Sequence, residues 1–180
     1  MIIHLNGMPG VGKLTVAKLL AEKINARLID NHLLIDLVLS LCERGSAEYF
    51  SLIKKINDVI LAEIAGKPDQ VFIFTNALAA ESANDRERFE QISQFSNKNG
   101  ITFVQILLSC DLEENKRRTV TESRKLKGKL TDADELAKLH QNYTIYHPPN
   151  EFSLEIETTK HSAETVAEQI KTYLDKIKPF

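Results

Sequence analysis

A glycine-rich segment near the start of the chain has the residue types and the spacing of a phosphate-binding loop. It runs Gly7-Met8-Pro9-Gly10-Val11-Gly12-Lys13, and Gly7, Gly12 and Lys13 match the pattern G-x-x-x-x-G-K. Glycines let the backbone turn so that successive N–H groups point into one concavity, where they bind phosphate oxygens. We expect the positive charge of Lys13 to reach the β- and γ-phosphates of a nucleoside triphosphate.

The segments on either side of this loop are those that such a site needs. Residues 2–5 form a short apolar run, which predicts a buried parallel strand. Val16, Leu19, Leu20 and Ile24 recur at helical spacing and predict a helix over residues 14–24. The loop therefore leads into a helix N-terminus, where free N–H groups and the helix dipole favour anions. The alternative is a chance glycine-rich turn, against which the spacing, the lysine and the flanking elements all argue.

The rest of the chain alternates strand-like runs with helical patterns, which predicts an α/β fold with a parallel sheet. We expect helices over residues 46–65 and 81–99, after Asp111, after the capping box that starts at Thr131, and from Ser162 onward. The predicted strands are residues 2–5, 27–29, 71–74, 101–108 and 152–156. The run over 101–108 is the strongest, and we expect it at the centre of the sheet.

Bulk properties limit the class of protein. The chain has 180 residues, 43% of them hydrophobic and 27% charged, which suits one globular domain over residues 1–180. A net charge of −2 argues against general attraction to nucleic acids or membranes. Cys42 and Cys110 have no metal-binding or redox spacing. No apolar run is long enough to cross a bilayer, and the first predicted strand leaves no room for a cleaved signal peptide, so we expect a cytoplasmic protein.

The glycine loop, Asp30 after the second strand and the Arg/Lys-rich segment after the fourth strand occur together in one known group. With these features the chain resembles the P-loop small-molecule kinases, a group that includes shikimate, gluconate and nucleoside monophosphate kinases and, as close relatives, chloramphenicol phosphotransferase-like enzymes. The resemblance covers nearly the whole chain in layout and is most specific at the glycine loop. It implies a P-loop NTPase three-layer sandwich, with a five-stranded parallel sheet in the order 2-3-1-4-5, helices on both faces and a small helical lid at about residues 116–131.

The resemblance also implies how ATP is held. Arg117 and Arg124 are seven residues apart, face one way on a helix, and would neutralise the transferring phosphoryl group as the lid closes. The alternative is a solvated basic face offset by neighbouring acidic residues. The residues that the resemblance places around ATP are Gly7, Pro9, Gly10, Val11, Gly12, Lys13, Leu14, Thr15 and Arg117.

Asp30 is the candidate for the acceptor side of the reaction. In similar kinases an acidic residue near this position contacts the acceptor hydroxyl and can act as base. The alternative, about as well supported by the sequence, is that Asp30 or Asn31 caps the helix that starts near His32. His32 itself could contact an acceptor, but a lone histidine more often just covers a helix start.

The chain departs from the group in three respects. Leu14 stands where a Ser or Thr normally binds Mg²⁺, although Thr15 can still contact the α-phosphate. The third strand ends in Thr75, where an Asp often assists the metal. Mg²⁺ would therefore arrive with ATP, held by phosphates and waters, and no protein ligand is assigned to it. The sequence also lacks the glycine pair that helps bind shikimate and the Asp-Gly-x-Pro-Arg run of adenylate-type kinases, so the acceptor stays open.

These observations favour an ATP-dependent kinase that transfers the γ-phosphate to a small-molecule acceptor, with Lys13, Asp30, Arg117 and Arg124 as its catalytic residues. The first alternative is a non-catalytic or weakly hydrolytic ATP-binding regulatory protein, which Leu14 and Thr75 motivate. A second alternative is a kinase that acts on nucleic-acid ends. The net acidity and the absence of aromatic residues among the basic ones speak against it.

Overall fold

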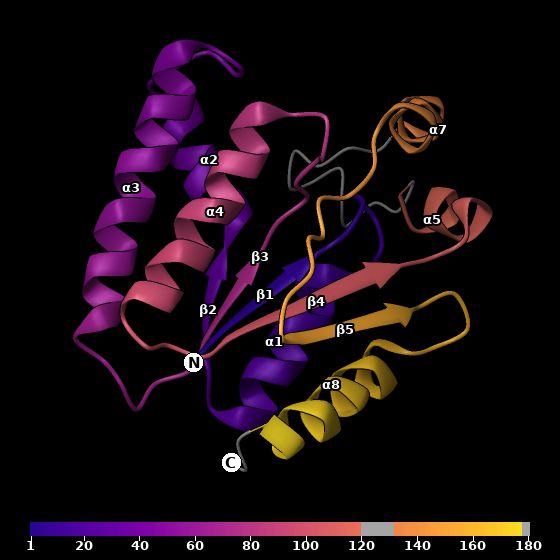
Figure 1. Ribbon diagram of the computed structural model, residues 1–180. Helices are drawn as coiled ribbons and strands as arrows, with labels where there is room; N and C mark the ends of the chain where they lie inside the picture. The colour runs from indigo at the N-terminus through magenta and orange to yellow at the C-terminus, as the bar shows by residue number, and fades with distance from the viewer. Residues whose placement is uncertain (120–131, 178–180) are drawn as a thin grey trace.

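A parallel five-stranded sheet forms the centre of the molecule. The computed structural model describes residues 1–119 and 132–177. The strand order is β2-β3-β1-β4-β5, as the resemblance implied, and all pairings are parallel, as the alternation of strand-like and helical segments predicted. Figure 1 shows the strands fanning out from one edge of the molecule. The strands are β1 (Ile2–Asn6), β2 (Arg27–Asp30), β3 (Phe72–Thr75), β4 (Phe103–Ser109) and β5 (Phe152–Glu157).

One expectation about the sheet is wrong. The long run after residue 101 forms β4, which lies between β1 and β5, and the central strand is β1. A strand is buried on both faces wherever helices cover the sheet on both sides. A long apolar run therefore predicts a buried strand but does not specify that the strand lies in the middle of the sheet. The glycine loop consequently starts from the centre of the sheet.

Helices cover both faces of the sheet, which gives the three layers that the resemblance implied. On one face α1 and α8 pack against alternating residues of β1 and β4, including Ile3, Leu5 and Val104. On the other face α3 and α4 pack against Ile2, Phe72 and other residues of the opposite parity. Figure 1 shows α1 and α8 on one side of the sheet and α2, α3 and α4 on the other. The helices are α1 (Lys13–Ile24), α2 (Asn31–Leu39), α3 (Ala47–Ala65), α4 (Ala83–Lys98), α5 (Leu112–Thr119), α7 (Ala133–Asn142) and α8 (Ala163–Ile177).

Short polar side chains mark the helix starts. Ser46 and Ser82 cap α3 and α4, each accepting a hydrogen bond from the backbone N–H three residues later. Asp132 caps α7 through the N–H groups of Asp134 and Glu135. The predicted capping box placed the cap at Thr131, which lies outside the described residues, and the capping side chain is that of Asp132. Within the described ranges, no helix is long and apolar enough to span a membrane.

Candidate functional site

The glycine loop lies between β1 and α1, at the carboxyl end of the central strand. Gly10 and Gly12 both have φ +97°, a left-handed conformation that favours glycine. Gly12 is the N-cap of α1 and makes no side-chain capping bond, and the first turn of α1 carries no acidic residue. The helix N-terminus therefore presents backbone donors to an anion.

The Lys13 side chain folds back over this loop. Its Nζ donates to the carbonyl oxygens of Gly7 at 2.7 Å and Met8 at 2.9 Å. These bonds keep the ammonium group at the loop, where a phosphate chain bound to the N–H groups would meet it. The Lys13 ammonium group therefore lies against the glycine loop.

A buried asparagine that the sequence analysis missed joins three loops at this edge of the sheet. The Oδ1 of Asn6 accepts from the backbone N–H groups of Gly7 and Leu78, both at 3.0 Å. Its Nδ2 donates to the carbonyl oxygen of Tyr146 at 2.9 Å. Asn6 therefore ties the glycine loop to the segment after β3 and to the segment before β5. The only sequence signal is a polar residue at the end of an apolar strand.

The basic residues of α5 take two different positions. The Arg117 side chain is 74% exposed and pairs with Glu114 at 2.7 Å. The Arg118 side chain is 22% exposed and reaches the glycine loop, donating to the carbonyl oxygen of Val11 at 3.4 Å and that of Thr158 at 2.8 Å. Arg117 and Arg118 both donate hydrogen bonds to the Glu114 carboxylate, and these bonds lower the pKa of Glu114 to about 2. Arg118, which the sequence analysis did not choose, is the one of the two that contacts the loop. Arg124 and the rest of the predicted lid from residue 120 to 131 lie outside the described residues.

The two replaced metal positions offer little to a cation. Leu14 is the second residue of α1, and its side chain contains no oxygen. Thr75 is buried, and its Oγ1 accepts from the backbone N–H of Asn31 at 3.5 Å. Among the described residues, no group of three or more His, Cys, Asp or Glu side chains could hold a metal ion. Neither Leu14 nor Thr75 supplies a carboxylate to a cation carried with the nucleotide.

Two adjoining cavities lie beside the loop. One, of about 370 Å³, is bordered by the loop residues Met8 and Pro9. The other, of about 390 Å³, lies between α3 and α4 and shares Arg44, Tyr49 and Asp85 with the first. Both volumes are in the lower part of the range for small-molecule sites. The phosphate loop thus opens directly onto a space of the size of a small acceptor.

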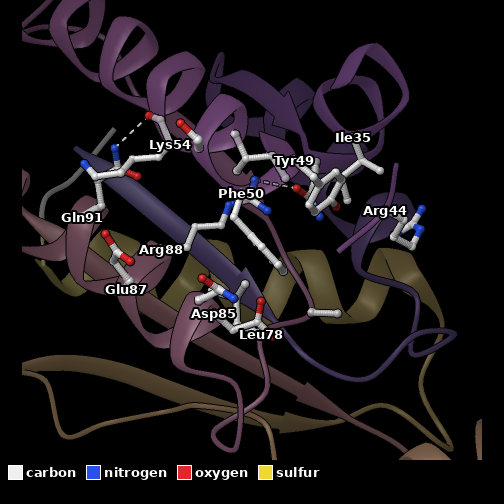
Figure 2. Close-up of a pocket in the computed structure, with 15 residues that line it drawn as sticks. Ile35, Arg44, Tyr49, Phe50, Lys54, Leu78, Asp85, Glu87, Arg88 and Gln91 are labelled. Carbon is white, nitrogen blue, oxygen red and sulfur yellow. Dashed lines mark hydrogen bonds between the residues drawn. The ribbon is translucent and has the colours of Figure 1, made fainter. Parts of the chain in front are cut away.

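Figure 2 shows how polar side chains enter the larger cavity. Arg88, from α4, extends between α3 and the segment that holds Leu78, and its Nη2 donates to the Asn31 Oδ1 at 2.6 Å. Burial lowers the pKa of Arg88 to about 10. Asp85 accepts from the backbone N–H of Ala79 at 3.0 Å through Oδ2. The sequence analysis predicted a helix over residues 81–99 but did not single out Arg88 as a site residue. The missed signal is that Arg88 lies four residues before the buried Ile92 and thus beside the buried stripe.

Asp30 takes the capping role that the sequence had left open. Its Oδ1 accepts from the backbone N–H of His32 at 3.0 Å and caps α2. Asp30 ends β2 beside Thr75 at the end of β3, so it lies at the same edge of the sheet as the glycine loop. It does not line either cavity, whereas the next residue, Asn31, does.

Comparison with solved structures identifies the fold. A sugar kinase from Janibacter sp. HTCC2649 matches with a TM-score of 0.67 at 16% identity, over 99% of this chain and 95% of that one. The APS kinase of Mycobacterium tuberculosis, solved with AMPPNP and APS, matches with a TM-score of 0.63 at 17% identity, over 97% of this chain and 96% of that one. The shikimate kinase of Bacteroides thetaiotaomicron matches with a TM-score of 0.61 at 23% identity, over 97% of this chain and 98% of that one.

The chain has the fold of the P-loop small-molecule kinases. At these identities the likeness establishes the fold alone, and no family model and no curated protein matches the sequence. The P-loop kinase fold brings the predicted loop residues together at the carboxyl end of β1. Asp30 lies outside the lining of the two cavities, and Arg117 is exposed. Asn6 and Arg118 contact the glycine loop, and Arg88 lines the larger cavity.

Proposed function

We propose that this protein is an ATP-dependent phosphotransferase that phosphorylates a hydroxyl group of a small molecule. The observation that carries the proposal is the continuity of two spaces. The glycine loop with Lys13 suits a triphosphate, and the cavity bordered by Met8 and Pro9 opens from it into the larger cavity between α3 and α4. A kinase needs such an arrangement because donor and acceptor must meet at the γ-phosphate.

In the proposed reaction, the acceptor oxygen bonds to the γ-phosphorus while the bond from that phosphorus to the β–γ bridging oxygen breaks. ADP leaves with the bridging oxygen, and the hydroxyl proton passes to a carboxylate. The loop N–H groups and Lys13 would stabilise the negative charge on the phosphates. Arg117 and Arg124 keep their proposed role in the closed enzyme, and Arg118 is added as a contact to the nucleotide side of the loop.

Two carboxylates are candidates for the proton acceptor. Asp30 is the carboxylate that the resemblance suggested, and only its Oδ1 accepts a hydrogen bond from the His32 N–H. Asp85 lines both cavities, and one of its oxygens holds the Ala79 N–H. Comparing Asp30→Asn with Asp85→Asn decides between them, because loss of the base lowers kcat by about 100-fold or more while ATP affinity stays near the native value.

A panel assay tests the proposal. Purified protein is incubated with ATP, Mg²⁺ and single members of a set of sugars, sugar acids, nucleosides and cyclic acids, and ADP release is measured against an acceptor-free control. Acceptor-dependent ADP release that is lost in Lys13→Ala supports the kinase. Tight ATP binding without turnover of any member would instead support the regulatory alternative.

The regulatory alternative rests on Leu14 and Thr75, and one variant separates it from the kinase. Leu14→Ser restores the hydroxyl at the usual metal position. If the native chain is a kinase that uses Mg²⁺ carried by ATP, the variant changes its rate and metal dependence but not the existence of activity. Activity that appears only in Leu14→Ser would identify the native chain as a binding protein.

A further inference from the structure

A buried side-chain amide on α5 has one unpaired atom, and that atom lies against the glycine loop. Asn115 is fully buried, and its Oδ1 has no hydrogen-bond partner among the described residues. This oxygen is so close to Gly10 that a Cβ there would overlap it. A buried acceptor without a partner costs free energy, so a state of the protein in which this amide is fully paired would be favoured.

The other end of the same amide contacts a histidine on α7. The Asn115 Nδ2 lies 2.9 Å from the His140 Nε2. An amide N–H can only donate, so in this arrangement the Nε2 accepts and the proton of the neutral ring is on Nδ1. The arrangement pairs the Nδ2 but leaves the Oδ1 unpaired beside the loop.

A half-turn of the amide about its Cβ–Cγ bond pairs the oxygen instead. The two ends of the amide are similar in size, so the exchange needs no additional space. The Oδ1 then accepts from His140 whenever the Nε2 carries a proton, in the other neutral tautomer or in the charged ring. The Nδ2 then faces Gly10 beside the Thr119 Oγ1, which donates to the Asn115 carbonyl oxygen and keeps a lone pair. A proton on the His140 Nε2 therefore selects which end of the amide faces the loop.

The two orientations of the amide have opposite effects on an anion in the loop. A carbonyl oxygen at the loop repels the phosphates that the loop N–H groups attract, whereas an amide N–H group in the same place attracts them. We propose that Asn115 is a positioning residue for the phosphate loop, and that a proton on the His140 Nε2 turns the amide into the orientation that favours nucleotide binding. The inference rests on the nucleotide site of the proposed function and adds a control of that site from α7. By reciprocity, a bound nucleotide favours the proton on Nε2.

The ring of His140 can be titrated separately from its charged neighbours. Burial lowers the pKa of His140 from its usual value, so the ring is neutral at about pH 7.5 in the free protein. The charged side chains on the elements around it are Glu113, Glu114, Lys116, Arg117 and Arg118 of α5, Asp134, Glu135 and Lys138 of α7, Lys13 of the phosphate loop, and Arg44 and Asp85, which border the smaller cavity with Leu139. The charged groups of α5 pair with one another. Side chains of these types ordinarily keep their charge between about pH 5.5 and 7.5.

Nitrogen NMR tests the inference in the native chain. The protein is labelled with ¹⁵N-histidine and titrated with acid, with and without saturating ADP, and the signals of His140 are assigned from the spectrum of His140→Gln. The chemical shifts of the two ring nitrogens report which of them carries the proton. We expect the proton on Nδ1 in the free protein and on Nε2 in the ADP complex at about pH 7.5. We also expect the ring to take up its second proton at a higher pH in the complex.

Variants separate the amide from the direct attraction between the phosphates and a charged ring. Asn115→Leu keeps the size of the side chain and the charges but removes the amide, so the ADP-induced change of tautomer should disappear. ADP affinity is measured by calorimetry at about pH 7.5 and 5.5, and we expect the native chain to gain about 3- to 10-fold over Asn115→Leu at the lower pH. The titration of ADP itself is common to both proteins and cancels. His140→Gln keeps a donor at every pH, so it should bind ADP at least as tightly as the native chain at pH 7.5 without the extra pH dependence. His161→Gln is the control, since His161 is exposed.

The outcomes separate this inference from the kinase proposal. A His140 ring that keeps its tautomer and its titration when ADP is bound would overturn the inference, whether or not any variant folds. The same pH dependence of ADP affinity in the native chain and in folded Asn115→Leu would also overturn it and would show that Asn115 only packs α5 on the loop. Either result would leave the kinase intact. No binding of ADP to the native chain would refute the nucleotide site and both proposals with it. The expected response to ADP in a protein that phosphorylates no acceptor would support this inference and count against the kinase.

Discussion

Gly10 of the glycine loop lies against Asn115 of α5 so closely that no side chain fits between them. A Cβ at Gly10 would overlap the Asn115 Oδ1 and approach the Thr119 Oγ1 at 2.6 Å. The Asn115 Nδ2 in turn lies 2.9 Å from the His140 Nε2 on α7. The phosphate loop therefore packs directly on α5, and Asn115 connects α5 to α7, so the geometry of the loop is coupled to the position of α5.

This contact gives a prediction about two glycines with the same backbone conformation. Gly10→Ala and Gly12→Ala both place a Cβ at φ +97°, at a cost of about 1–2 kcal/mol, but the Cβ at Gly12 meets open space. We expect Gly10→Ala to lower the free energy of unfolding by a further ~1–3 kcal/mol because of the overlap. Chemical denaturation measures the difference, and Asn115→Ala should recover part of it in the double variant. Equal losses at Gly10 and Gly12 would show that the contact with α5 has no energetic weight.

Replacing Lys13 should affect the ligand more than the fold. Lys13→Ala removes the ammonium group but little buried apolar surface, and its hydrogen bonds to the Gly7 and Met8 carbonyl oxygens contribute about 1 kcal/mol each. We expect ATP affinity to fall by about 10- to 100-fold, as for the loss of a charged hydrogen bond. Calorimetry on Lys13→Ala is compared with Lys18→Ala, an exposed lysine of the same helix. Native affinity in a folded Lys13→Ala protein would remove the basis of the site assignment.

The two arginines of α5 should differ in their effect on nucleotide binding. Arg118 contacts the carbonyl oxygens of Val11 and Thr158, whereas Arg117 is exposed and pairs with Glu114. We expect Arg118→Met to weaken ATP binding and to destabilise the protein by about 1–3 kcal/mol, because buried acceptors lose their donor. Arg117→Met should cost less than about 1 kcal/mol of stability, as for an exposed pair. Its effect on kcat then tests the lid role that the sequence suggested, and an unchanged kcat in Arg117→Met would refute that role.

A buried histidine should make stability depend on pH. Burial lowers the pKa of His4 from 6.5 to about 3, and its Nε2 lies 3.0 Å from the Asn76 Oδ1. Between pH 6.5 and about pH 3, His4 binds a proton in the unfolded chain but stays neutral in the folded protein. The stabilisation is therefore complete above pH 6.5 and is lost as the pH falls. We expect a loss of about 2 kcal/mol from pH 6.5 to 5, where most carboxylates stay charged.

Denaturation curves for His4→Gln over this range test the assignment. The variant should show a shallower pH dependence than the native chain, with the remaining slope from His140 and His147, whose pKa values burial also lowers. His161→Gln serves as the control because this side chain is exposed. The same slope in His4→Gln and in the native chain would exclude His4 as the source.

The sequence alone determined the local structure and the phosphate loop. Most strands are short runs rich in apolar residues, and several helices start at a capping side chain, namely Ser46, Ser82 and Asp132. Local hydrogen bonding and side-chain periodicity therefore specify these elements within a few residues. The phosphate loop could likewise be predicted from local sequence. Gly7, Gly12 and Lys13 lie close together in the chain, and their spacing by itself indicates a phosphate-binding loop.

Only the tertiary structure decided which side chains meet. Arg117 and Arg118 are adjacent in sequence, but the helix turns about 100° between them, so packing of α5 on the loop selects Arg118. Arg88 meets Asn31 from 57 positions away because α2 and α4 lie on the same face of the sheet. The order of strands placed β1 at the centre in the same way. These contacts depend on how distant segments pack together, and no local pattern of residues encodes that.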